Sequence, residues 1–247
     1  MNGDVCVFLG PTMPREDAAR ELDAVFLPPV AQGDVIRAAE RKPAAIAIVD
    51  GYFECVPAVW HKEILFAIRQ GIPVFGASSM GALRAAELHP FGMIGVGAIF
   101  EAYRDGRLED DDEVAVVHGP AELGYPMLSE AMVNIRRTLA DAEADGVLTL
   151  PLAQTLEGIA KDLPYRERGY GRMLRLAGEL GEDPQALARF RNWLPTGRFD
   201  QKRDDARLML RTVRRWLGQD AVPPEPRFHF EHTALFDRAV REAALAA

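Results

Sequence analysis

The sequence predicts an α/β fold, with an N-terminal parallel β-sheet flanked by helices and then a helical C-terminal region. Three short, almost continuously apolar segments, at residues 4–10, 44–51 and 72–77, are typical of strands that are buried on both faces of a sheet. Segments with helical spacing separate them, which favours parallel strands joined by crossover helices. We therefore expect an α/β core over residues 1–126 and a helical region over residues 127–247.

The individual elements follow from apolar spacing and from the glycines and prolines between segments. In the first half we expect strands at 4–10, 24–30 (weaker, because two prolines break it), 44–51 and 72–77, helices at 34–42, 56–71 and 79–89, and a last or edge strand at 112–119. In the second half we expect helices at 127–146, 150–164, 169–181, 183–194 and 200–218, followed by an extended, proline-rich tail at 219–230.

Composition excludes several classes of protein. The net charge of −8 argues against nonspecific binding to nucleic acid or to an anionic membrane, because both need a basic surface. The first residues lack the pattern of a signal peptide, and no apolar run approaches the roughly 18 residues of a membrane-spanning helix. Cys6 and Cys55 are the only cysteines, so neither a disulfide framework nor a cysteine-based zinc site is expected. We expect a cytoplasmic protein.

Two serines mark the junction at which a predicted strand turns directly into a helix. Ser78 and Ser79 lie between Ala77 and Gly81, where the strand at 72–77 gives way to the helix at 79–89. The carboxyl edge of a parallel sheet holds the ligand sites of such folds, so hydroxyl groups at this junction are candidates for chemistry. The plain alternative is helix capping, and we expect it of Ser78.

A lysine is expected at the same edge of the sheet. Lys62 lies near the start of the helix at 56–71, beside Trp60 and an apolar run. An uncharged amine can take the proton of a serine hydroxyl, and burial favours the uncharged form of lysine. Ser79-Met80-Gly81 matches the second half of a G-x-S-x-G nucleophile elbow, so we expect Ser79 to be the nucleophile and Lys62 its base.

Backbone groups near this junction could bind a substrate oxygen. The N–H group of Met80, at the start of a helix, is the first candidate donor to an oxyanion, and the segment with Gly10 and Thr12 offers a second. Asp50 ends a strand at the same edge and is placed to orient a ligand. Gly76 is small enough to let a substrate approach the backbone closely.

Other polar residues have plainer explanations. His61 and His118 are candidate bases, but a lone histidine is more often a surface residue. The acidic run at 109–113 could bind a cation, although a solvated loop or a docking surface for basic residues of a partner is the more common role.

Seven motifs occur in order over residues 4–138 and resemble the TfuA family. They are FLGPT (8–12), IVDGYF (48–53), PAVWHKEIL (57–65), GIPVFGASSMGALRAAEL (71–88), FGMIGVGAIFEAYRDG (91–106), DDDEVAVVHGPAE (110–122) and LSEAMVNIRRT (128–138).

This resemblance implies an accessory hydrolase for peptide-backbone thioamidation. TfuA-like proteins are partners of YcaO enzymes, and they release sulfide from the C-terminal thiocarboxylate of a ThiS-like sulfur carrier. The family site is a serine–lysine pair, which falls here on Ser79 or Ser78 and on Lys62. Such chemistry needs no metal and no organic cofactor. Two other possibilities stay open: a non-catalytic adaptor that binds a YcaO enzyme, and a small-molecule or phosphate binder that uses the helix start at Ser79.

Overall fold

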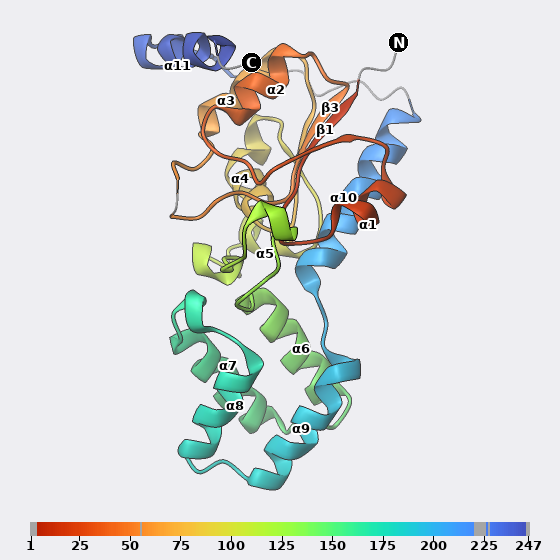
Figure 1. Cartoon of the computed structure of the whole chain (residues 1–247), viewed down its shortest axis with the longest axis vertical. Helices are drawn as coiled ribbons and strands as arrows, with labels where there is room; N and C mark the ends of the chain where they lie inside the picture. Colours follow the sequence, from red (N-terminus) through yellow and green to blue (C-terminus); the bar gives the residue numbers. More distant parts are fainter. Residues whose placement is uncertain (1–3, 55, 220–225, 227, 246–247) are drawn as a thin grey trace. The chain divides into compact units, whose positions relative to one another are not determined.

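The structure is a computed structural model that describes residues 4–54, 56–219, 226 and 228–245. Its contacts divide the chain into two compact units (Figure 1). The first, which we call the sheet unit, combines the residues up to 109 with those from 203 onward, and the second, the helical unit, spans residues 110–202. The expected division between residues 126 and 127 therefore falls inside the helical unit, and the described residues from 203 onward belong with the sheet.

Five parallel strands form the sheet in the order β2-β1-β3-β4-β5. They are β1 (Val5–Phe8), β2 (Val25–Leu27), β3 (Ala45–Ile48), β4 (Val74–Gly76) and β5 (Ile94–Gly95). Every residue of β1, β3 and β4 is buried, which confirms the prediction that these strands are covered on both faces.

Helices cover the sheet on both sides (Figure 1). One side carries α2 (Asp34–Glu40), α3 (His61–Arg69) and α4 (Met80–Leu88), and the other carries α1 (Arg15–Glu21) and α10 (Gln201–Leu217). On the α10 side, the apolar core joins strand and helix residues, among them Val5, Val7, Ala45, Ala47, Ala206, Met209, Leu210 and Val213. Two further helices, α5 (Ala98–Arg104) and α11 (Ala234–Leu245), complete the described part of this unit.

The expected last strand at 112–119 is wrong. This stretch contains a 3₁₀ turn at Asp111–Glu113 and an isolated antiparallel bridge between His118 and Met127. Val114 and Ala115 are buried, but without strand partners, because a short apolar run predicts burial better than it predicts a strand. The sheet ends instead with β5, whose two residues are too short to give a sequence signal. Most of the expected extended tail at 219–230 lies outside the described residues.

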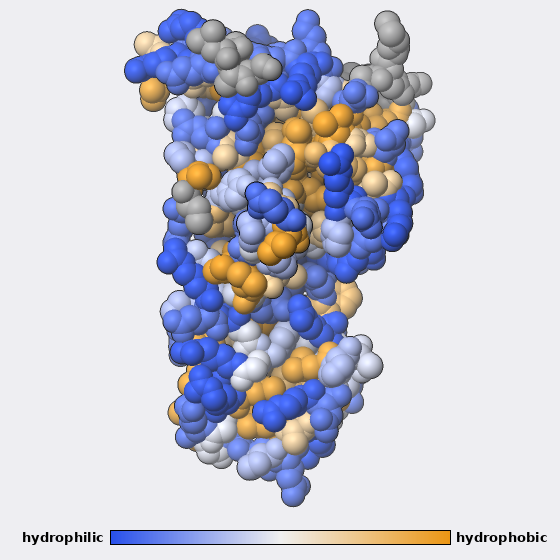
Figure 2. Space-filling view, in the orientation of Figure 1, coloured by the Kyte–Doolittle hydropathy of each residue, from blue (hydrophilic) through white to orange (hydrophobic). Residues whose placement is uncertain are grey.

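Four helices build the helical unit. They are α6 (Met132–Ala144), α7 (Leu150–Asp162), α8 (Tyr170–Glu179) and α9 (Pro184–Gly197), and their inward residues form one apolar cluster. Figure 2 shows a largely hydrophilic surface that is interrupted by apolar patches, as expected for amphipathic helices. Within the described residues, no helix is both long and apolar enough to cross a membrane.

Candidate functional site

The strand order creates a natural site between β1 and β3. The chain leaves β1 toward β2 on one side and leaves β3 toward β4 on the other, so the loops after these two strands run apart. In open parallel sheets, ligands bind in the crevice outside the carboxyl ends of the strands at this point. Gly10 and Thr12 follow β1, Asp50 follows β3, and the two serines follow β4.

Asp50 ties the loop after β1 to the end of β3. One carboxylate oxygen accepts the N–H groups of Gly10 (2.8 Å) and Thr12 (3.1 Å). The other accepts the Thr12 hydroxyl at 2.6 Å. Asp50 and Thr12 are both buried. The Thr12 N–H group, which the sequence offered as a second oxyanion donor, is therefore already occupied by Asp50.

Ser78 occupies the sharp turn between β4 and α4. Its φ of +69° lies in the left-handed region, which residues other than glycine rarely adopt. The N–H of Ser79 donates to the carbonyl of Ala77 at 2.8 Å, so the chain makes a three-residue γ-turn about Ser78. The Ser78 hydroxyl is buried and lies 3.3 Å from the Thr12 hydroxyl. A strained strand-to-helix turn of this kind is typical of a nucleophile elbow.

Ser79, not Ser78, occupies the N-cap position of α4. Its carbonyl accepts the N–H groups of Ala82 (2.9 Å) and Leu83 (3.3 Å), but its side chain makes no capping hydrogen bond. The prediction that Ser78 caps the helix is therefore wrong, and capping does not explain either hydroxyl. The following residue, Met80, begins the helix, where N–H groups lack acceptors within the helix. Its N–H stays the candidate oxyanion donor.

Two glycines let α4 start very close to the strands. A Cβ atom on Gly81 would lie 1.7 Å from the carbonyl oxygen of Ile48, and one on Gly76 would lie 2.2 Å from the carbonyl oxygen of Gly81. A Cβ atom on Gly10 would similarly lie 2.4 Å from the ring of Pro29. The space beside Gly76 is thus filled by the protein itself rather than held open for a substrate.

The amine of Lys62 is engaged away from the serine junction. It donates to the Thr233 hydroxyl at 3.3 Å and lies 5.4 Å and 5.3 Å from the ring centres of Phe230 and Phe236. Among the described residues, these are the contacts that the structure gives this amine. Aromatic faces attract an ammonium group, which accounts for the position of the side chain. The serine–lysine pair stays a prediction, and it requires this amine to leave Thr233.

The two candidate histidines lie outside the serine cluster. His61 pairs with Glu87 at 2.7 Å, and Arg84 holds the same carboxylate at 2.8 Å. Burial raises the pKa of Glu87, but the hydrogen bonds from His61 and Arg84 outweigh it and leave the pKa below its ordinary value. His118 packs edge-on against Tyr125 in the helical unit.

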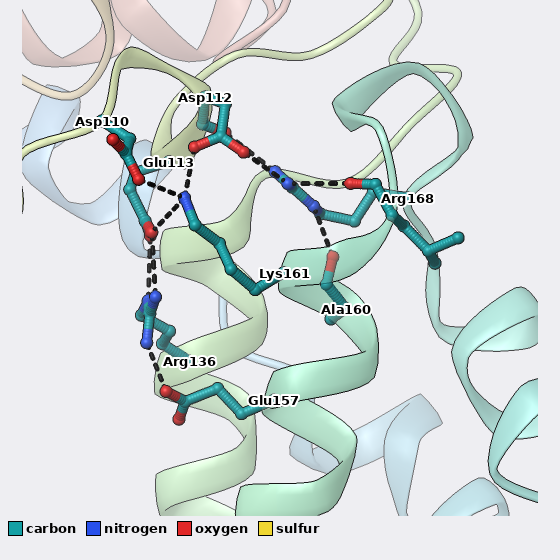
Figure 3. A network of polar contacts seen from close by, with 9 residues as sticks. Asp110, Asp112, Glu113, Arg136, Glu157, Ala160, Lys161 and Arg168 are labelled. Carbon is teal, nitrogen blue, oxygen red and sulfur yellow. Dashed lines mark hydrogen bonds and ion pairs between the residues drawn. The ribbon is translucent and has the colours of Figure 1, made fainter. Parts of the chain in front are cut away.

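The acidic run is part of an internal ionic network of the helical unit (Figure 3). Lys161 lies 3.0 Å from Asp110 and 3.0 Å from Glu113, and it also bonds Asp112. Arg168, whose side chain is fully buried, donates to the Asp112 carboxylate at 2.7 Å. The three carboxylates are close enough to hold a metal ion, but the ammonium group of Lys161 stands among them. The position that a cation would take is therefore occupied by Lys161, whereas Glu109, Asp110 and Asp111 are exposed, and their role as a docking surface stays a prediction.

Sequence reasoning missed one feature of the sheet unit. A cavity of about 360 Å³ is lined by residues of α2, α3 and α11, with Trp60 and Glu63 among them. Glu63 is buried and accepts the N–H groups of Gly33 (2.8 Å) and Trp60 (3.1 Å). Burial raises the pKa of Glu63 despite these hydrogen bonds. Its carboxyl completes the start of α3.

Part of the chain matches a known protein family. Residues 50–169 match the family model of the TfuA-like proteins. The chain belongs to the TfuA family. The match begins at Asp50 and includes Lys62, both serines and the ionic network, whereas Thr12 lies before it. A search of curated proteins found no match to the TfuA-like chain.

Proposed function

We propose that this TfuA-family chain is an accessory hydrolase for YcaO-dependent thioamidation of peptide backbones. Its substrate would be the C-terminal thiocarboxylate of a ThiS-like sulfur carrier, and its product the sulfide that the YcaO enzyme uses. The observation that carries the proposal is the strained turn at Ser78, which presents a hydroxyl at the carboxyl edge of the sheet. Membership of the TfuA family supports the choice of substrate and partner.

The proposed chemistry proceeds through a serine ester. The Ser78 oxygen attacks the thiocarboxylate carbon, and its proton passes to a base. The Met80 N–H, in the first turn of α4, stabilises the negative oxygen of the tetrahedral intermediate. The carbon–sulfur bond then breaks and sulfide leaves. Water hydrolyses the remaining ester, which frees the carrier as a carboxylate and restores the serine.

Of the two serines, the backbone geometry favours Ser78. Its left-handed φ and its position before the first turn of α4 are those of an elbow nucleophile, whereas Ser79 has the N-cap position. Gly76-Ala77-Ser78 also matches the first half of the G-x-S-x-G pattern. We therefore replace the expectation for Ser79 with Ser78 as the proposed nucleophile.

Lys62 is the second member of the proposed site. As an ammonium group it would attract the anionic carrier tail, and as a free amine it would take a proton from the serine. Lys62→Arg and Lys62→Ala separate these roles, because arginine keeps the positive charge but stays protonated in proteins. If Lys62→Arg is as inactive as Lys62→Ala, the result supports the serine–lysine pair. If Lys62→Arg keeps the activity that Lys62→Ala loses, the result supports attraction of the carrier tail by charge.

The direct experiment measures sulfide release from a purified thiocarboxylated ThiS-like carrier. The wild-type chain should convert the carrier thiocarboxylate to a carboxylate, a mass change that is readily resolved. Ser78→Ala should abolish this conversion and leave the thermal unfolding temperature nearly unchanged. A wild-type chain that leaves the thiocarboxylate intact, with and without the YcaO enzyme, would contradict the proposal.

A non-catalytic adaptor is the second candidate function. It is favoured by the burial of Ser78 and Ser79, because a carrier tail does not reach a buried hydroxyl in this conformation. In that case, the chain should bind a YcaO enzyme and raise its affinity for peptide, and Ser78→Ala should leave both effects intact while no carrier is hydrolysed.

A further inference from the structure

Three buried oxygen groups form a chain from Ser78 to a carboxylate. The Ser78 hydroxyl lies 3.3 Å from the Thr12 hydroxyl, which lies 2.6 Å from Asp50. The residues come from the loops after β4, β1 and β3, and all three are buried. The carboxylate is the strongest base of the three groups, so the chain of hydroxyls ends on a proton acceptor.

The direction of these hydrogen bonds follows from counting protons. An ionised carboxylate can only accept, so the single hydroxyl proton of Thr12 is donated to Asp50. Thr12 then has no proton left for Ser78, and Ser78 must donate to Thr12. The Ser78 proton therefore points along the chain toward Asp50, and the lone pairs of its oxygen point away from Thr12.

We propose that Thr12 and Asp50 are positioning residues for Ser78 and carry its proton during thiocarboxylate hydrolysis. As the new carbon–oxygen bond forms, the Ser78 proton moves to the Thr12 oxygen and the Thr12 proton moves to Asp50. When the carbon–sulfur bond breaks, the Thr12 hydroxyl gives a proton to the departing sulfur and takes one back from Asp50. Sulfide leaves as HS⁻ and Ser78 is left as an ester, so charge and atoms balance.

This inference rests on Ser78 as the proposed nucleophile, and it assigns the first proton transfer to Asp50 rather than to Lys62. The Lys62 amine contacts Thr233 at 3.3 Å, whereas the route through Thr12 is already hydrogen-bonded. Lys62 then has the role of a cation toward the thiocarboxylate, which is the role that Lys62→Arg preserves.

Substitutions of Thr12 can separate its role in the fold from its role in proton transfer. Asp50 also accepts the N–H groups of Gly10 and Thr12, and these two bonds hold the loop without the hydroxyl. Thr12→Val keeps the shape and the N–H group and removes only the hydroxyl. Thr12→Ser restores the hydroxyl and removes only a methyl group. The two variants are a matched pair in which structure and proton transfer should respond differently.

The experiment compares carrier hydrolysis by the wild-type chain, Thr12→Val, Thr12→Ser and Asp50→Asn. Loss of a proton acceptor costs about 10²–10⁴-fold in rate, so kcat should fall by at least 10²-fold in Thr12→Val, with KM and the unfolding temperature almost unchanged. Thr12→Ser should recover kcat to within about fivefold of the wild type, and Asp50→Asn, which removes the proton acceptor itself, should lower kcat by at least about 10²-fold. A Thr12→Val variant within threefold of wild-type kcat, or a Thr12→Ser variant as slow as Thr12→Val, would overturn the inference.

A second readout separates this inference from the choice of substrate. A fluorophosphonate reagent attacks activated serines without any carrier, and mass spectrometry of the digested chain reports the modified residue. We expect labelling of Ser78 in the wild-type chain and at least tenfold slower labelling in Thr12→Val. That result supports the proton path even if the carrier is not hydrolysed, in which case only the proposed substrate fails. Equal labelling rates, or a wild-type Ser78 that stays unlabelled, would count against the path.

Discussion

The hydroxyl groups of Thr12 and Ser78 lie 3.3 Å apart, although the two residues are 66 positions apart in the sequence. Thr12 belongs to the loop after β1 and Ser78 to the loop after β4, and β3 lies between these strands. Asp50 follows β3 and accepts a hydrogen bond from the Thr12 hydroxyl. The site is therefore a product of the strand order, since no two of its three residues are neighbours in the chain.

We predict that Gly81→Ala destabilises the sheet unit by about 3 kcal/mol or more, the range of severe core substitutions. The added Cβ atom would lie 1.7 Å from the carbonyl oxygen of Ile48, so α4 must move away from β3. Urea unfolding measures the change. Gly158→Ala in α7 is the control, because its Cβ atom would meet nothing within 4 Å and alanine favours helices by about 1 kcal/mol. Similar effects of the two substitutions would refute the close approach.

We predict that Asp112→Asn destabilises the helical unit by about 1–3 kcal/mol at pH 7, because buried Arg168 loses its carboxylate partner. Burial raises the pKa of Asp112. The hydrogen bonds from Lys161 and Arg168 lower it by more than this, so the pKa of Asp112 lies below its ordinary value. A carboxyl group whose pKa is lower in the folded than in the unfolded chain stabilises the fold at pH values above its ordinary pKa. This stabilisation is lost as the pH falls through the pKa of the folded state.

The difference between wild type and Asp112→Asn should therefore shrink below about pH 4, near the ordinary pKa of aspartate. Urea unfolding at pH 7 and pH 3 checks this. Glu157→Gln is the control for a carboxylate in the same network, because the Glu157–Arg136 pair is partly exposed and such pairs contribute at most about 1 kcal/mol. An equal penalty for Asp112→Asn at both pH values would show that ionisation of Asp112 is not involved.

The contact between Lys62 and the C-terminal segment should restrain the proposed site. Phe236→Leu keeps an apolar side chain against Phe66 but removes a ring face from the amine, and Thr233→Val removes its hydrogen-bond acceptor. Because the proposal requires the amine to leave this segment, we expect the double variant to hydrolyse the carrier severalfold faster. Steady-state sulfide release at saturating carrier measures it, and a rate at or below that of the wild type would speak against the restraint.

The sequence predicts the sheet better than it predicts what covers it. Continuous apolar runs identify β1, β3 and β4, since strands buried on both faces leave little room for polar residues. The amphipathic pattern of α10 reveals an apolar face but not its partner, so its return to the sheet was not foreseen. The same limit applies to Val114 and Ala115, whose burial does not depend on strand pairing.

The candidate site shows a similar division. The carboxyl-edge rule brings Thr12, Asp50 and Ser78 to one place, because it depends only on strand direction. The left-handed turn at Ser78 was missed, since serine has no preference for positive φ and the close approach of Gly81 to β3 is a tertiary effect. The position of the Lys62 amine was missed too, because residues 230–236 lie about 170 positions away in the chain and a long side chain follows local contacts.

The most direct test of the account is a rapid-quench experiment with the thiocarboxylated carrier, followed by digestion and mass spectrometry of residues 71–88. The account predicts a transient ester between the carrier carboxyl group and Ser78, formed at least as fast as sulfide is released and absent in Ser78→Ala. An ester on Ser79, or full sulfide release by Ser78→Ala, would contradict it.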